Sequence, residues 1–104
     1  MHTLHIPSKF LQIINRLETA DEPLENKLSH LLESEVRRRL ARYEMTDRLF
    51  QKKYGMSLDM FEKEELVARS GYSFEIENDH QDWDMAIDGI KMMREELIRL
   101  QTEA

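Results

Sequence analysis

Residues 24–54 read LENKLSHLLESEVRRRLARYEMTDRLFQKKY, the longest stretch of this 104-residue chain without a glycine or a proline. Apolar side chains recur in it mostly at intervals of three or four residues, the spacing of one face of an α-helix. They are Leu24, Leu28, Leu31, Leu32, Val36, Leu40, Tyr43, Phe50 and Tyr54. Thr46 and Asp47 interrupt this stripe, so we expect either a bend there or a change in the partner that covers the helix. A helix of about 30 residues is roughly 45 Å long, too long for a compact monomer of this size to cover. The stretch therefore also predicts a dimer.

The residues before this helix predict a strand and a shorter helix. Residues 3–6 alternate between polar and apolar side chains, a short strand pattern that Pro7 ends. From Ser8, which suits an N-cap, apolar side chains recur at helical spacing as far as Leu17. A polar turn follows, and Pro23 suits the first turn of the long helix.

The C-terminal half predicts a helix, a strand and a second long helix. A short helix extends from its N-cap at Ser57 to Val67. Residues 72–77 alternate between apolar and polar side chains, which predicts a second strand. Asp79 and Asp82 open the last helix, where negative charge suits the helix dipole. Its apolar seam consists of Trp83, Ile87, Ile90, Met93, Leu97 and Leu100.

These elements together predict a mainly α protein that forms a dimer. In chain order we expect a short N-terminal strand, a first helix, one long central helix, a short helix, a second short strand and a long C-terminal helix. Residues 1–55 would be the dimerisation region, with a strand and two helices. Residues 56–104 would be a helix–strand–helix region that binds a partner.

The composition excludes several classes of protein. The chain has no cysteine, which excludes disulfide scaffolds, zinc fingers and thiol nucleophiles, and only three glycines, which leaves little room for a phosphate-binding loop. No apolar run approaches the roughly 18 residues of a membrane span, and the N-terminus has no secretory-signal pattern. We therefore expect a cytoplasmic protein without membrane contact that is not an enzyme, with no catalytic residue, no cofactor and no metal.

Charge is strongly segregated along the chain, whose net charge is −6. Residues 36–53 carry seven basic and two acidic side chains, whereas residues 70–90 carry six acidic side chains and no lysine or arginine. Such a block is a solvated surface, a site for a basic partner, or a surface that covers the basic block of residues 36–53 within a dimer. As the partner-binding residues we select Glu75, Glu77, Asp79, Asp82, Trp83 and Asp84. Trp83 is either an apolar anchor for the partner or, as such aromatic residues more often are, a core residue.

Three stretches carry a resemblance to a known family. They are RYEMTDR at residues 42–48, KYGM at residues 53–56 and WDMAIDGI at residues 83–90. They resemble a family of small prokaryotic proteins that are encoded beside TumE-type toxins and taken to be their antitoxins. The resemblance covers roughly residues 23–95. It implies a non-catalytic, cytoplasmic antitoxin that binds and neutralises a basic toxin protein. If the toxin cleaves RNA, carboxylates of the antitoxin could block it by occupying the sites where the RNA phosphates bind.

The N-terminal third is similar in layout to a ribbon–helix–helix DNA-binding domain, whose paired strands enter the major groove of DNA. Such a strand would place Thr3 and His5 toward the bases. However, the strand has no arginine, lysine, glutamine or asparagine to read base edges, and residues 21–25 are acidic where phosphates would bind. Operator binding by the antitoxin, or a DNA-binding repressor dimer, stays open as an alternative.

A third alternative rests on two pairs of carboxylates. Glu62 and Glu65 are one helical turn apart, as are Asp79 and Asp82. This pattern is loosely similar to helical nucleotide pyrophosphohydrolases, whose paired acidic helices hold magnesium. The competing interpretation is that each pair is an exposed helix start in a chain with 21 acidic residues. We therefore predict no metal site.

Overall fold

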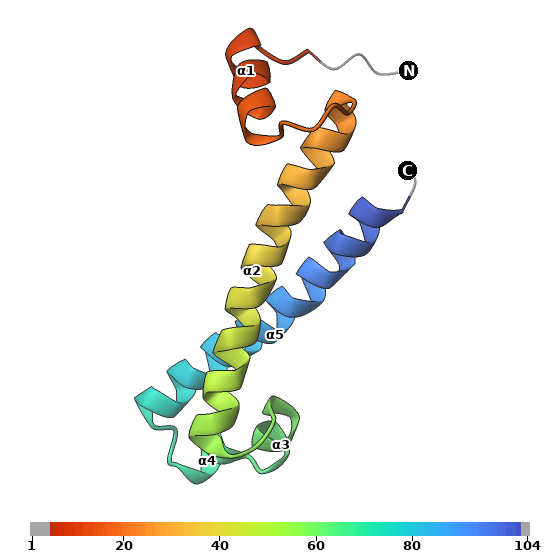
Figure 1. Ribbon diagram of the computed structural model, residues 1–104. Coiled ribbons are helices and arrows are strands. Elements are labelled where there is room, and N and C mark those ends of the chain that lie inside the picture. Colours follow the sequence, from red (N-terminus) through yellow and green to blue (C-terminus); the bar gives the residue numbers. More distant parts are fainter. Residues whose placement is uncertain (1–4, 103–104) are drawn as a thin grey trace. The chain divides into compact units, whose positions relative to one another are not determined.

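The computed structural model describes residues 5–102, and in this range the regular structure consists of helices (Figure 1). The helices are α1 (Ser8–Leu17), α2 (Leu24–Tyr54), α3 (Leu58–Lys63), α4 (Leu66–Arg69) and α5 (Phe74–Gln101). The chain divides into two compact units, Met1–Glu35 and Val36–Ala104, which we describe separately. The expectation of a mainly helical chain with two long helices is confirmed.

The first unit holds α1 against the start of α2 through polar contacts. Lys27 Nζ donates a hydrogen bond to Asn15 Oδ1 over 2.9 Å. His30 Nδ1 lies 3.0 Å from Glu18 Oε1 and 3.2 Å from Glu22 Oε1. Ile14 is the one buried apolar side chain of α1, so the described part of this unit has a small core.

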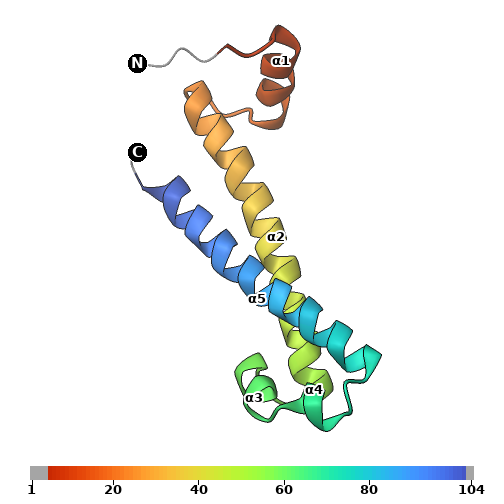
Figure 2. The ribbon, with the colours of Figure 1, turned by 180° about the vertical axis from the view of Figure 1, so that it is seen from behind.

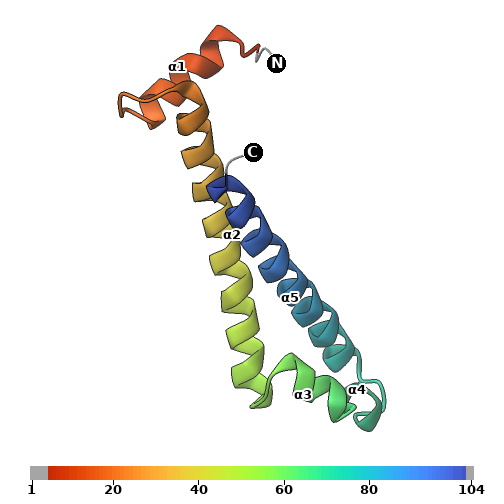
Figure 3. The same ribbon diagram turned by 90° about the vertical axis from the view of Figure 1, so that its right-hand side faces the viewer.

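The second unit has an aromatic core built around Trp83, whose side chain is fully buried. Phe61 and Leu58 of α3 complete the buried cluster, and half-buried side chains of α2 and α4 pack around it. Because Ser57 accepts a hydrogen bond from the amide of Met60, α3 begins where the sequence predicts. Figure 3 shows α3 and α4 connecting the end of α2 to the start of α5.

The helices α2 and α5 approach each other closely at one glycine. A Cβ atom on Gly89 would lie 2.6 Å from the ring of Tyr43. Figures 1 and 2 show α5 crossing the C-terminal part of α2. Along one face of α5, Ala86, Ile90, Met93 and Leu97 are buried. This face carries most of the predicted apolar seam.

The predicted second strand is wrong. Residues 74–77 form the first turn of α5 because the Ser73 side chain accepts a hydrogen bond from the amide of Ile76, which is a helix N-cap. Glu75 and Glu77 then stabilise the positive end of the helix dipole. Three alternating apolar residues were too short a pattern to outweigh these signals.

The structure also differs from the sequence-based expectations at the N-terminal strand, at the start of α1 and in the third helix. The first predicted strand is not formed in its described part, since residues 5–7 have no regular structure, while Thr3 and Leu4 lie outside the described residues. The N-cap of α1 is Pro7 rather than Ser8. The predicted third helix is divided into α3 and α4, with Glu65 in a left-handed conformation between them.

Candidate functional site

The six predicted partner-binding residues all lie on the first three turns of α5, but they point in different directions. A helix distributes consecutive residues around its axis, whereas the predicted strand and turn would have gathered them at one corner. The structure therefore divides them into a buried residue, an ion-paired group and an exposed group.

Trp83 is a core residue and not the exposed anchor that we expected. Its indole Nε1 donates a hydrogen bond to Asp47 Oδ1 over 2.8 Å. The rings of Phe50, Tyr54 and Phe61 surround it, with centroids 5.3–5.9 Å away. In this fold Trp83 is not accessible to a partner.

Asp79 is half-buried and ion-paired with the end of α2. Its Oδ2 accepts hydrogen bonds from Lys53 Nζ over 2.6 Å and from the Tyr54 hydroxyl over 2.5 Å, and Lys53 also pairs with Glu75 over 2.9 Å. Burial by itself would raise the pKa of Asp79, but the hydrogen bonds from Lys53 and Tyr54 lower it overall. Burial and the bond to Asp79 raise the pKa of Tyr54 to about 12. Part of the acidic block is thus neutralised by Lys53, which belongs to the basic block at residues 36–53 of the same chain.

The other acidic residues leave a charged, partly apolar surface on α5. We define the outer face of α5 as Phe74, Glu77, Asp84, Met85, Asp88 and Met92. Phe74, Met85 and Met92 are 80%, 69% and 57% exposed. Within residues 5–102, no ion pair is found for the three carboxylates of this face. Asp82 lies at the edge of this face, in a hollow of about 310 Å³ that Tyr43 and Met85 also line.

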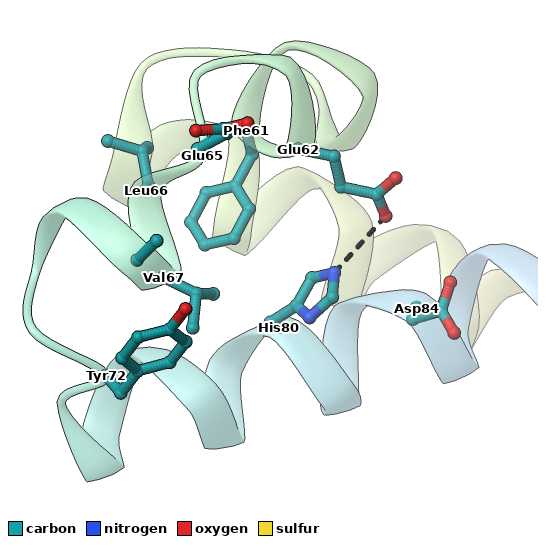
Figure 4. Close-up of a pocket in the computed structure, with 9 residues that line it drawn as sticks. Phe61, Glu62, Glu65, Leu66, Val67, Tyr72, His80 and Asp84 are labelled. Carbon is teal, nitrogen blue, oxygen red and sulfur yellow. Dashed lines mark hydrogen bonds and ion pairs between the residues drawn. The ribbon is translucent and has the colours of Figure 1, made fainter.

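A pocket of about 490 Å³ lies where α3, α4 and α5 meet, and we call it the α3–α5 pocket (Figure 4). Phe61, Leu66, Val67, Ala68 and Tyr72 form its apolar lining, while Glu62, Glu65, His80 and Asp84 form its polar lining. His80 Nε2 lies 3.2 Å from Glu62 Oε1, and the His80 ring stacks on Phe61 with centroids 5.7 Å apart. The sequence did not indicate this pocket, because its walls come from three separate helices.

The carboxylates proposed for magnesium do not come together. Asp79 is bonded to Lys53 and Tyr54, and Glu62 is bonded to His80. Within the described part of the chain, the one group of three side chains with metal-ligand spacing is Glu18, Glu22 and His30, whose ligand atoms lie within 4.8 Å of one another. The close approach of His30 Nδ1 to the carboxylates of both glutamates accounts for that group.

Of the two residues selected for DNA contact, the structure describes only His5. Thr3 lies outside the described residues, and His5 is exposed in a segment without regular structure. His5 lines a shallow hollow with Ile6, Pro7, Leu11 and Leu24. The DNA-binding alternative keeps no structural support in residues 5–102.

Comparisons with known proteins add no assignment. No protein-family model, curated protein or solved structure matches this chain. Among the described helices, none is both long enough and apolar enough to cross a membrane.

Proposed function

We propose that the chain acts as an antitoxin, a cytoplasmic protein that binds a basic toxin protein and neutralises it by contact. The observation that supports this proposal best is the outer face of α5. It combines exposed apolar side chains with three carboxylates that have no ion pair within residues 5–102, and residues 70–90 contain no lysine or arginine. The resemblance of residues 42–48, 53–56 and 83–90 to antitoxins encoded beside TumE-type toxins points to the same class of partner.

The chemistry of this face suits a basic protein surface. Phe74, Met85 and Met92 are large apolar side chains, and fully burying such a side chain stabilises a complex by about 1.5–3 kcal/mol. Methionine also adapts to the shape of a partner. The carboxylates of Glu77, Asp84 and Asp88 would meet lysine or arginine, which speeds association and selects the partner. These apolar side chains, and not Trp83, would therefore contribute most of the binding free energy.

A growth assay tests this proposal. The protein encoded in the adjacent open reading frame is expressed in a host cell, and co-expression of this chain should restore growth. The double charge reversal Glu77→Lys/Asp88→Lys should abolish the rescue, because it places two cations opposite a basic surface. The matched control is Glu25→Lys/Asp59→Lys, which changes the net charge equally at exposed residues of α2 and α3 outside the outer face.

Two outcomes would overturn the proposal. One is an adjacent protein that does not impair growth, since there would then be nothing to neutralise. The other is equal rescue by the native chain and by Glu77→Lys/Asp88→Lys when both accumulate to the same level. Circular dichroism of the purified variants confirms that each is as helical as the native chain.

A further inference from the structure

We propose that the α3–α5 pocket binds the side chain of an arginine or lysine from the basic partner. This inference rests on the proposed function and names the group that the partner inserts. The pocket is within the usual size range of ligand sites, about 300–1,000 Å³, and its volume is about 490 Å³.

The lining of the pocket matches a cation on an aliphatic stem. Leu66, Val67 and Ala68 offer apolar surface for the stem. Figure 4 shows Val67 close to Tyr72 and the Phe61 ring close to His80. Tyr72 is 64% exposed, so its ring is accessible, and aromatic faces attract ammonium and guanidinium groups.

The charge of the lining selects the same ligand. Three carboxylates line the pocket, and none of the lining residues is a lysine or arginine. Glu62 is bonded to His80, whereas the carboxylates of Glu65 and Asp84 have no ion pair within residues 5–102. A neutral apolar ligand would take water away from both carboxylates without giving them a partner, which is unfavourable. A cation would pair with them.

The backbone at this pocket is held in an unusual conformation. Among the described non-glycine residues, only Glu65 and Tyr72 have positive φ angles, of 51° and 58°, and both line the pocket. Such conformations are unfavourable for residues with a Cβ and concentrate at ligand clamps. Glycine would adopt them at no steric cost, so the presence of Tyr72 is explained if its ring is used.

Binding of a small probe to the isolated chain tests this inference. Nα-acetyl-arginine-N-methylamide is titrated into the 15N-labelled protein to about 50 mM, and its neutral isostere Nα-acetyl-citrulline-N-methylamide is titrated in parallel. The arginine probe should shift the amide signals of residues 61–68, 72, 80 and 84 with saturation, and the citrulline probe should bind at least fivefold more weakly. Equal binding of both probes, or no saturable shift at these residues, would overturn the inference.

Two variants locate the site. Tyr72→Gly removes the ring and relieves the backbone, so it should keep or increase the melting temperature while weakening binding of the arginine probe at least threefold. Glu65→Gln/Asp84→Asn should weaken binding similarly, whereas the matched pair Asp88→Asn/Glu95→Gln should leave it unchanged. Unaltered binding in the first two variants would contradict the inference.

The proposed function is tested separately. The probe titration needs no partner, so it can fail while the growth rescue succeeds. That result would contradict the insertion of a cationic side chain into the pocket and leave the antitoxin function supported. Conversely, if the chain binds the probe but does not restore growth, the cation site is supported and the antitoxin function is contradicted.

Discussion

The indole Nε1 of Trp83 donates a hydrogen bond to the carboxylate of Asp47, 2.8 Å away, and this bond explains why a polar residue interrupts the apolar stripe of α2. A buried indole N–H requires an acceptor, and Asp47 supplies it from the facing helix. The residue that indicated a bend in the sequence is instead the polar partner of Trp83, the most buried side chain among residues 5–102. α2 continues through this position as a helix.

Removal of that acceptor should destabilise the second unit. Asp47→Ala leaves the indole N–H without a partner and should lower the free energy of unfolding by about 1–3 kcal/mol. Urea denaturation followed by the fluorescence of Trp83, the only tryptophan, measures the change. Arg48→Ala, at the next residue of the same helix, is the control and should change stability by less than about 0.5 kcal/mol. Equal stability of the two variants would show that the bond contributes nothing.

A methyl group at the helix crossing should have an effect that depends on Tyr43. Gly89→Ala would normally stabilise a helix by about 1 kcal/mol, but the new Cβ would lie 2.6 Å from the Tyr43 ring. We therefore expect a net loss of about 1–3 kcal/mol from overpacking. In a Tyr43→Ala background the same substitution should become stabilising. Denaturant unfolding of the native chain, the two single variants and the double variant measures this change of sign. A stabilising effect of Gly89→Ala in both backgrounds would contradict the close approach.

The Lys53–Tyr54–Asp79 network should make stability depend on acid pH. The pKa of Asp79 is lowered in the folded chain, so its ionised form stabilises the fold above the ordinary aspartate pKa of about 3.9. This contribution is lost as the pH falls through the lower pKa of the folded state. Asp79→Asn should therefore reduce stability at pH 6 and narrow its difference from the native chain toward pH 2. Asp88→Asn is the control, and an Asp79→Asn deficit that is constant with pH would refute the network.

The dimer remains a prediction from the sequence, and α2 offers residues that test it. Leu32, Met45 and Leu49 are 56%, 56% and 62% exposed in the single chain. If a second copy covers this helix, the native protein should sediment as a dimer at micromolar concentration, and Leu32→Asp should shift it to a monomer because burying a carboxylate is unfavourable. Met60→Asp, at an exposed apolar residue of α3, should leave the dimer intact. A native monomer would end this idea.

Local signals in the sequence predicted much of the helical structure. The start of α2 after Pro23 and the N-cap of α3 at Ser57 both agree with the structure. The strand at residues 72–77 failed because the Ser73 cap and two acidic residues outweigh a short alternation. Helix formation there shows that a pattern of only three apolar residues is a weak strand signal.

The candidate site depended on contacts between distant residues, which one sequence does not reveal. Lys53 pairs with Glu75 and Asp79, 22 and 26 residues away, so the acidic block has a cation that its own segment lacks. The sequence alone leaves Trp83 as either a core residue or a partner contact, because its acceptor, Asp47, is 36 residues away. What the sequence did indicate is the acidity of residues 70–90, and part of that charge is exposed on the outer face of α5.

The kinetics of association with the purified product of the adjacent open reading frame test the central claim most directly. Because exposed charges act mainly on the association rate, this rate should fall at least tenfold between about 50 mM and 500 mM salt, where screening becomes strong. Glu77→Lys/Asp88→Lys should slow association at low salt by a similar factor, and Glu25→Lys/Asp59→Lys should slow it less than threefold. Association that is insensitive to salt and equal in both variants would show that the outer face of α5 is only a solvated surface.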